Sequence, residues 1–291
     1  MHSIGIATDS HSGISPQDAE ALGIRVLPMP FTINGENYLE GVTVSREEFF
    51  AYQQADADIA TSQPAPTDVL ALWDEMLATY DEILYLPISS GLSGSCGAAM
   101  ALAEEEPYAG RVFVVDIGRV SVPLRSAVTD AVNLVRAGHS AAEVREILER
   151  TKDDMVIYVA VQTLQHLKKG GRISPTVAAV GTLLHIKPIL HLSIGLLEPF
   201  KNCRGFTKAR EAMIEAVRHD LDTRFSDAHL RGDLHLMAAS SASAEETASW
   251  VAEIEAAFPG MPVTCDYLSL GVSCHTGEGA LGIGLCCSPR P

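Results

Sequence analysis

Three segments of this chain combine hydroxyl side chains with glycine, proline or histidine. They read Thr-Ser-Gln-Pro-Ala-Pro at residues 61–66, Ser-Ser-Gly-Leu-Ser-Gly-Ser at residues 89–95 and Cys-His-Thr-Gly-Glu-Gly-Ala-Leu-Gly at residues 274–282. Hydroxyl groups and exposed backbone N–H groups donate hydrogen bonds to carboxylate or phosphate oxygens. Each segment therefore predicts either an anion-binding site or a structural role, in which the hydroxyls cap helices and close turns.

The segment 89–95 gives the strongest indication of binding. It follows an apolar run that ends at Ile88 and precedes a helical pattern that includes Ala98 and Leu102. A glycine-rich turn from strand to helix exposes backbone N–H groups at the positive end of the helix dipole, which favours an anion. The segment also holds more hydroxyls than one helix cap requires, so we expect it to bind an anion.

The other two segments leave both explanations open. In residues 61–66 the hydroxyls and prolines are common turn residues, and Thr67 or Asp68 can cap the next helix. In residues 274–282 the glycines allow tight turns or close approach of the backbone to a ligand. A single histidine in such a loop, here His275, is as often structural as functional.

A serine hydrolase is the main alternative function. Ser93 is then the nucleophile and His275 the base, with Glu278 or Asp9 open as the acid that orients the histidine. The nucleophile elbow requires Gly-x-Ser-x-Gly, whereas residues 91–95 read Gly-Leu-Ser-Gly-Ser, with the second glycine one position early. We therefore favour a non-catalytic protein and assign no catalytic residue.

Nucleotide and metal chemistry have little support. The chain contains neither Gly-x-x-x-x-Gly-Lys-[Ser/Thr] nor Gly-x-Gly-x-x-Gly after its first apolar run, and neither His-x-x-x-His nor His-Glu-x-x-His. The six cysteines form no Cys-x-x-Cys pair, which favours buried free thiols in a reducing cytosol. We expect no metal and no cofactor.

Charge and hydropathy argue against two further classes. The formal net charge is −16, and so acidic a surface repels nucleic acid and anionic membranes. The N-terminal sequence lacks a basic region and a long apolar region, and no apolar run reaches the ~18 residues of a transmembrane helix. We expect a cytoplasmic protein without stable membrane insertion.

Two basic segments stand out against this acidic background. Residues 168–175 read Lys-Lys-Gly-Gly-Arg-Ile-Ser-Pro, a turn expected to place Arg172 just before a helix. Residues 201–204 read Lys-Asn-Cys-Arg and end at Arg204. These segments are either solvated turns or a place where guanidinium groups pair with a phosphate or an acidic partner.

The elements that must position these segments form an α/β pattern in the first half of the chain. Compact apolar runs, typical of strands covered on both faces, occupy residues 4–7, 83–86 and 112–115. Residues 69–77 repeat at helical spacing, and Ser45 and Ser140 each have a glutamate three positions later, as in a capping box. This alternation predicts a mostly parallel sheet between helices.

The second half predicts a different arrangement. A hairpin is expected over residues 189–197, then a helix near 207–217 and a helix capped by Ser243. Further strands are expected near residues 234–238, 263–268 and 281–286. We therefore predict an N-terminal α/β/α domain over residues 1–163, with a mostly parallel sheet, and a C-terminal α+β domain over residues 164–291, with a mixed sheet.

Taken together, the motifs resemble the DegV family of fatty-acid-binding proteins over nearly the whole chain. The motifs that carry the resemblance are Ala-Thr-Asp-Ser at residues 7–10, Thr-Ser-Gln-Pro at 61–64, Ile-Ser-Ser-Gly-Leu-Ser-Gly at 88–94, Leu-Lys-Lys-Gly-Gly-Arg-Ile-Ser at 167–174, Ile-Lys-Pro-Ile-Leu at 186–190 and His-Thr-Gly-Glu-Gly-Ala-Leu-Gly at 275–282. Each motif is short, and their common order and spacing make the resemblance specific.

The resemblance implies a carrier that encloses one long-chain fatty acid in an apolar tunnel, with the C-terminal domain enclosing the lipid. It also implies that hydroxyl groups hold the carboxylate and that the closing His-Thr-Gly loop lies near the same head group. The residues that the resemblance assigns to the carboxylate are Thr61, Ser62, Ser93, Gly94, His275 and Thr276.

Some members of the family are the lipid-binding subunit of a bacterial fatty acid kinase and present the acid for phosphorylation to acyl phosphate. By resemblance, Arg172 and Arg204 face the kinase or the transferred phosphate. The sequence departs from the family pattern at residues 95–97, 116–118 and 191–195. These departures leave the anchoring hydroxyls in place and bear on the shape of the acyl pocket.

Overall fold

The structure is a computed structural model that describes residues 2–173, 186–193 and 196–290. The chain divides into two compact units, Met1–Asp153 with Pro289–Pro291 and Asp154–Ser288. The boundary that we placed after residue 163 falls inside the second unit, because strand β8 (Met155–Ala160) pairs with strands of the second unit. In the described ranges, no helix combines the length and the apolar character needed to cross a bilayer.

The first unit is built on a parallel sheet with the strand order β2-β1-β6-β7. Its strands are β1 (Ile4–Asp9), β2 (Arg25–Leu27), β6 (Glu82–Leu86) and β7 (Val112–Val114). In β6, Leu84 and Leu86 belong to one buried cluster, and Ile83 and Tyr85 belong to another. Successive strand residues point to opposite faces, so both faces of this sheet are covered, as the apolar runs predict.

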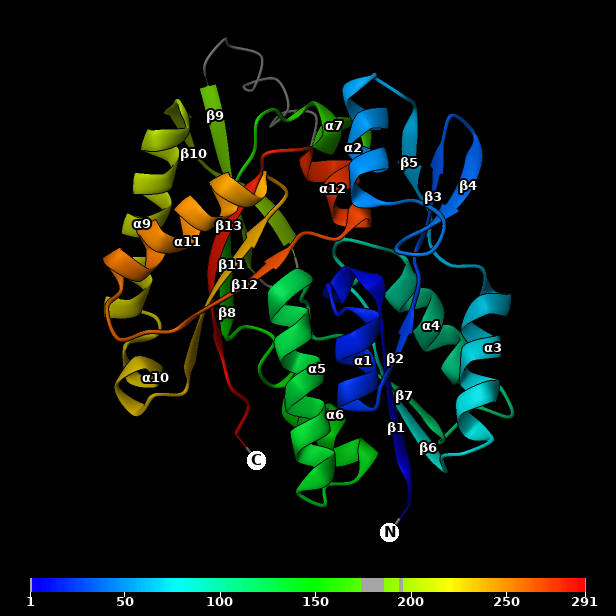
Figure 1. The fold of residues 1–291 in the computed structure, drawn as a ribbon. Helices are drawn as coiled ribbons and strands as arrows, with labels where there is room; N and C mark the ends of the chain where they lie inside the picture. The colour runs from blue at the N-terminus through cyan, green and yellow to red at the C-terminus, as the bar shows by residue number, and fades with distance from the viewer. Residues whose placement is uncertain (1, 174–185, 194–195, 291) are drawn as a thin grey trace. The chain divides into compact units, whose positions relative to one another are not determined.

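Helices cover the two faces of the parallel sheet, as Figure 1 shows. One face carries α1 (Pro16–Leu22), α5 (Ser121–Arg136) and α6 (Ala141–Glu149), and the other carries α3 (Pro66–Leu77) and α4 (Ser95–Ala103). The predicted α/β/α arrangement is therefore confirmed for the first unit.

The helix starts agree with the sequence in two places and differ in a third. Ser45 and Ser140 form the expected capping boxes at α2 (Arg46–Gln54) and α6. The helix α3 begins at Pro66 after Ala65 and has no side-chain cap, so a cap from Thr67 or Asp68 is wrong. Proline suits the first helical position, because the N–H that it lacks has no partner there in any helix.

A small antiparallel sheet that the sequence patterns did not reveal completes the first unit. Its strand order is β4-β3-β5, with β3 (Pro30–Ile33), β4 (Glu36–Leu39) and β5 (Ile59–Thr61). The last residue of β5, Thr61, lies opposite Phe31 of β3. This pairing fixes the point at which the Thr-Ser-Gln-Pro segment leaves the sheet.

The second unit contains a mixed six-stranded sheet in the order β10-β9-β8-β13-β11-β12. Its strands besides β8 are β9 (Ile186–Ser193), β10 (Leu196–Arg204), β11 (Leu234–Ser240), β12 (Val263–Tyr267) and β13 (Leu281–Cys287). Only β11 and β12 run parallel, and the other neighbours are antiparallel. The mixed sheet and the antiparallel β9–β10 pair are confirmed, and residues 194–195 between those strands lie outside the described ranges.

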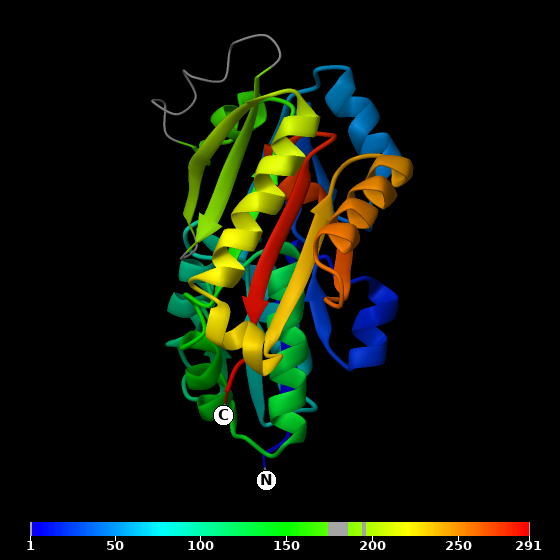
Figure 2. The same cartoon turned by 90° about the vertical axis from the view of Figure 1, so that its left-hand side faces the viewer.

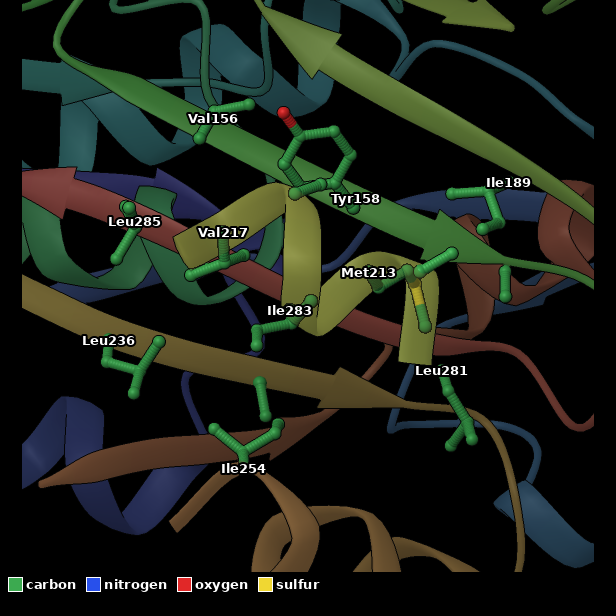
Figure 3. Packing of buried hydrophobic residues seen from close by; sticks show 14 of the residues in the cluster. Val156, Tyr158, Ile189, Met213, Val217, Leu236, Ile254, Leu281, Ile283 and Leu285 are labelled. Atoms are coloured by element: carbon green, nitrogen blue, oxygen red, sulfur yellow. The ribbon is translucent and has the colours of Figure 1, made fainter. Parts of the chain in front are cut away.

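Helices α9 (Phe206–Asp222) and α11 (Ala244–Ala257) cover one face of this sheet, as Figure 2 shows, with the short α10 (Ser226–Arg231) beside them. Figure 3 shows Met213 and Val217 of α9 packed towards Ile283 of β13 and Tyr158 of β8. The opposite face carries a smaller cluster with α7 (Gln165–Lys169) and α12 (Leu270–Thr276).

Candidate functional site

The carboxyl edge of the parallel sheet has the topology of a ligand site. From β1 the chain turns to β2 on one side, and it later returns to β6 on the other side of β1. The helix after β1 and the helix after β6 lie on opposite faces, and α/β sheets bind ligands outside the carboxyl ends of strands related in this way. The segment 89–95 follows β6 at this point, so the fold places it where α/β sheets bind ligands.

Within the segment 89–95, Ser89 organises the turn. Its hydroxyl accepts the Gly91 N–H at 3.1 Å, and its carbonyl accepts the N–H groups of Leu92 at 3.0 Å and Ser93 at 3.1 Å. The Ser93 Oγ accepts from the N–H of Ser95 at 3.3 Å and from its hydroxyl at 3.0 Å. With Ser95 donating both bonds, the Ser93 hydroxyl keeps its own hydrogen for an acceptor such as a carboxylate.

The structure brings the first two predicted segments together. The Oε1 of Gln63 lies 3.2 Å from the position that a Cβ on Gly94 would take, so Gln63 of one segment lies against the backbone of the other. Thr61 and Ser93 are half-buried, and Ser62 is exposed. The hydroxyl-bearing segments at the end of β5 and after β6 are therefore neighbours.

Charge around this site is set by a carboxylate that the sequence patterns did not assign to it. Asp116 accepts from the Ser90 N–H at 3.2 Å, the Ser90 hydroxyl at 2.6 Å and Lys152 Nζ at 2.7 Å. Partial burial alone raises the pKa of Asp116, but the hydrogen bonds from Lys152 and Ser90 outweigh burial and lower the pKa below its usual value. Asp116 is therefore ionised at neutral pH.

Cys96, the second residue of α4, is not a reactive thiol. Burial, with a smaller contribution from the charge of Asp116, raises the pKa of Cys96 to about 12. A thiol in this state is neither a nucleophile nor a metal ligand at neutral pH. All six cysteines lie among the described residues, none of them forms a disulfide and five are buried, in agreement with the interpretation as buried thiols.

The third predicted segment is less of a loop than its glycines suggest. His275 and Thr276 are the last two residues of helix α12, and the chain enters β13 at Leu281. The Thr276 Oγ1 donates within the fold, at 3.3 Å to the Val272 carbonyl and at 3.4 Å to that of Gly277. This hydroxyl already has acceptors of its own, unlike that of Ser93.

Two reciprocal contacts between histidine and glycine join α7 to α12. The imidazole of His275 occupies the space where a Cβ on Gly170, just after α7, would lie. The His166 Cδ2 lies 2.7 Å from the Cβ position of Gly277, just after α12. The glycines here make room for imidazole rings, which the sequence did not reveal.

A buried serine fixes the turn after α12. The Ser241 hydroxyl donates to the Gly277 carbonyl at 2.6 Å and accepts the Ala280 N–H at 2.9 Å. Ser241 directly follows β11, and no motif in the sequence marks it for this role. It was missed because the contact joins positions far apart in the chain.

The two arginines with predicted partner roles differ in their surroundings. The Nη1 of Arg172 donates to the carbonyl of Gly170, the residue on which His275 packs, so Arg172 and His275 share a neighbour. Arg204 is exposed at the end of β10, opposite Ile186. Residues 168 and 169 are helical rather than part of a turn, and the helix expected after Arg172 lies outside the described residues.

The metal and hydrolase alternatives depend on clusters of ligating side chains and on an acid beside His275. Across the residues that the structure describes, no group of three or more His, Cys, Asp or Glu side chains could hold a metal ion. Asp9 is fully buried, and its Oδ1 accepts from the backbone N–H of His11 at 3.0 Å. The Nδ1 of the His11 ring lies 3.2 Å from the same oxygen. Of the two acids considered for orienting His275, Asp9 is thus engaged by His11, and Glu278 is exposed.

Among the residues that sequence reasoning missed, Asp116 left a signal. It stands two positions after β7, the strand next to β6, and side chains at the ends of neighbouring parallel strands meet at one edge of the sheet. Arg119, whose carbonyl accepts the Ser89 N–H at 2.9 Å, left none, because a backbone carbonyl has no sequence signature.

Comparison with known proteins gives matches over nearly the whole chain. A family model described as "Uncharacterised protein, DegV family" matches residues 3–287. A DegV domain-containing protein of Deinococcus radiodurans is 33% identical, over 97% of this chain and 98% of the relative. Protein DegV of Bacillus subtilis is 29% identical, over 97% of this chain and 99% of the relative.

Solved structures also match this chain over nearly its whole length. A DegV family protein from Thermus thermophilus, described for its fatty acid binding, has a TM-score of 0.85 and 33% identity, with coverage of 98% of this chain and 99% of that chain. DegV from Bacillus subtilis, described as a fatty acid binding protein, has a TM-score of 0.83 and 27% identity, with coverage of 99% and 100%.

Proposed function

The chain belongs to the DegV family, and from this premise we propose that it binds a long-chain fatty acid and acts as a carrier without chemistry of its own. The relatives from Thermus thermophilus and Bacillus subtilis, both described as binding fatty acids, support the ligand class. We further propose that the tail lies in an apolar tunnel and that Thr61, Ser62 and Ser93 hold the carboxylate, with the backbone at Gly94 beside it.

The observation that carries the proposal is the meeting of two hydroxyl-bearing segments at the carboxyl edge of the parallel sheet. Gln63 lies against Gly94, and the Ser93 hydroxyl has a hydrogen to donate after it accepts both bonds from Ser95. The first turn of α4 adds backbone N–H groups and the positive end of a helix dipole. Together these donors suit a carboxylate.

The energetics of lipid binding assign different tasks to the tail and the head group. Burial of each methylene gains ~0.8 kcal/mol, so about fifteen methylenes gain on the order of 10 kcal/mol before ordering costs. An unpaired buried carboxylate would cancel much of that gain. The tail therefore supplies affinity. The hydroxyl groups offset the cost of burying the carboxylate, which would otherwise reduce that affinity.

Native mass spectrometry of the protein purified from a bacterial host tests the proposal. We expect a bound mass that corresponds to a long-chain fatty acid. Ser93→Ala and Thr61→Ala are each expected to lower the bound fraction about fivefold or more, since each removes a donor to a charged group. Ser249→Ala, at an exposed hydroxyl on α11, is the matched control and should retain the wild-type fraction. Equal retention in all three variants would refute the head-group assignment.

His275 and Thr276 remain proposed head-group residues. An imidazole N–H can donate to a carboxylate, whereas the Thr276 hydroxyl would exchange its bonds to the Val272 and Gly277 carbonyls for one to the ligand. The same measurement on His275→Ala and Thr276→Ser tests this part. Loss of the acid from His275→Ala is expected, and full retention by Thr276→Ser, which keeps the hydroxyl, is expected as well. Retention by His275→Ala at the wild-type level would leave the imidazole with its packing role against Gly170 alone.

We also propose that the bound acid is presented to a fatty acid kinase for phosphorylation to acyl phosphate. The exposed side chain of Arg204 is available to an acidic surface or a phosphate of such a partner. Reconstitution with a bacterial fatty acid kinase catalytic subunit and ATP tests this, with acyl phosphate trapped as the hydroxamate. Arg204→Ala should reduce the rate, and Lys208→Ala, at an exposed cation nearby in the chain, is the control. An unchanged rate with Arg204→Ala would contradict its role.

A further inference from the structure

The start of the segment 89–95 is held by groups from outside it. The Ile88 N–H donates to Asp9 Oδ2 at 2.8 Å, and the Ser89 N–H donates to the Arg119 carbonyl at 2.9 Å. Ser90 donates through both its N–H and its hydroxyl to Asp116. Three consecutive residues thus have acceptors elsewhere in the first unit, so tertiary contacts set the position of this segment.

Asp116 and Arg119, the two acceptors that follow β7, are both hydrogen-bonded to the turn after α6. Lys152 Nζ donates to Asp116 at 2.7 Å, and the Nη2 of Arg119 donates to the carbonyl and the hydroxyl of Thr151, each at 3.0 Å. Arg119 is fully buried, so its guanidinium cannot exchange these bonds for water. Thr151 and Lys152 are neighbours just after α6 and therefore hold both acceptors at once.

Displacement of Ser89 or Ser90 reaches Ser93 through the turn. The Ser89 carbonyl accepts the Ser93 N–H at 3.1 Å, and Ser93 Oγ is in turn bonded to Ser95 at the first turn of α4. The Ser90 hydroxyl is exposed, but its partner Asp116 is half-buried and carries the charge of the pair. A short charged hydrogen bond of this kind is worth more than an ordinary surface contact.

From these contacts we propose that Asp116, fixed by Lys152, is a positioning residue for the carboxylate site. It holds Ser90, and through the Ser89 turn it sets where the Ser93 hydroxyl points. This inference rests on the proposed function, in which Ser93 donates to the carboxylate of a fatty acid. Asp116 acts on the ligand through the segment 89–95, so its loss should weaken recognition of the head group and leave recognition of the tail intact.

Comparison of an acid with its ester separates the two effects. The probes are cis-parinaric acid, which is fluorescent when bound, and its methyl ester, which keeps the chain but lacks the charged head. Asp116→Ala is expected to weaken acid binding about tenfold and ester binding less than about twofold. Asp116→Asn should lie between Asp116→Ala and wild type, because an amide oxygen can still accept from Ser90. Equal losses for acid and ester would mean general destabilisation and overturn the proposal.

A double-mutant cycle tests the route through Ser93. If Asp116 acts by aiming that hydroxyl, Asp116→Ala should cost little further acid affinity in a Ser93→Ala background. Additive losses would overturn the route. A wild-type protein that binds acid and ester equally well would instead count against the proposed head-group site, which keeps the two failures distinguishable.

Amide hydrogen exchange tests the positioning without any ligand. Faster exchange at residues 88–93 is expected in Asp116→Ala, and a smaller increase is expected in Lys152→Met, which leaves the Ser90–Asp116 bonds in place. Asp222→Ala, at an exposed carboxyl on α9, is the matched control. Unchanged exchange at residues 88–93 in both test variants would overturn the proposal even if the protein bound no acid.

Discussion

The segments around Ser93 and around Thr276 share small residues and hydroxyls, yet the fold uses them differently. Around Ser93, neighbouring elements hold the backbone, and the Ser93 hydroxyl accepts from Ser95 while its hydrogen remains available. Around Thr276, the hydroxyl donates inside the fold, and the imidazole of His275 packs on a glycine. Residue types alone therefore do not distinguish a presented hydroxyl from a committed one.

The difference arises from the end of the helix at which each segment lies. Residues 89–95 lie between a strand end and the start of α4, where unpaired N–H groups collect. Thr276 ends a helix, where the unpaired groups are carbonyls, and its hydroxyl donates to two carbonyls there. The start of a helix offers N–H donors to an anion. The carbonyls at the end of a helix instead accept the hydrogen of a nearby hydroxyl.

The largest expected effect comes from a substitution at Gly170, which would disturb the packing of His275 beside Thr276. Gly170→Ala is expected to destabilise the protein by about 1–3 kcal/mol, because its Cβ would occupy the space of the His275 ring. Chemical denaturation measures the change in unfolding free energy. The double variant Gly170→Ala with His275→Ala should recover most of the loss. Gly97→Ala on α4, whose Cβ meets no atom within 4 Å, is the matched control and should cost nothing.

A pH dependence is expected from Asp130 on α5, in the first unit. Burial raises the pKa of Asp130 to about 6, partly offset by the charge of Arg119. Because this folded-state pKa exceeds the unfolded value of 3.8, the folded protein binds the extra proton, and the stability that Asp130 contributes falls as pH rises from about 4 to about 6. The difference between these two pKa values corresponds to a contribution of about 3 kcal/mol over this window.

Denaturation curves of the wild type and of Asp130→Asn across that window measure the contribution. The variant should lose this part of the slope, because it has no carboxyl to titrate. Asp222→Asn, at an exposed carboxyl, serves as the control. Identical slopes for the wild type and Asp130→Asn would show that Asp130 does not titrate there.

The smallest expected effect is at Thr276 itself. Thr276→Val should lower the unfolding free energy by about 1 kcal/mol, since the hydroxyl donates to buried carbonyls, and Thr276→Ser should restore it. Thermal and chemical denaturation check both variants. Full stability of Thr276→Val combined with loss of the fatty acid would place this hydroxyl towards the ligand, and the contrast with Ser93 would not hold.

Local chemistry explains which structural predictions succeeded. The capping boxes at Ser45 and Ser140 and the Ser243 cap of α11 depend on residues three positions apart, and all are formed. The apolar runs in β6 and β7 depend only on burial of both faces, and these strands also formed as expected. The small sheet of β3, β4 and β5 was missed because its pairings join positions distant in sequence.

In the candidate site, too, local patterns were predictable and contacts between distant residues were not. The sequence predicts the Ser93 segment as a candidate site because a glycine-rich turn between a strand and a helix is a local pattern with a known electrostatic consequence. It misjudged the surroundings of Thr276, since glycines within residues 274–282 predict a loop, whereas His275 and Thr276 belong to α12. It gave no sign that imidazole rings fill the space beside Gly170 and Gly277.

By itself, the amino-acid sequence determined the α/β class, the family and the hydroxyl-bearing segment after β6, because these depend on periodicity and on motifs of a few residues. Tertiary structure alone decided that the Thr61 and Ser93 segments are neighbours and that Asp116 and Arg119 hold Ser90 and Ser89 in place. The physical reason is that a hydrogen bond depends on distance and direction, and the fold, not the spacing along the chain, sets both for residues far apart in sequence.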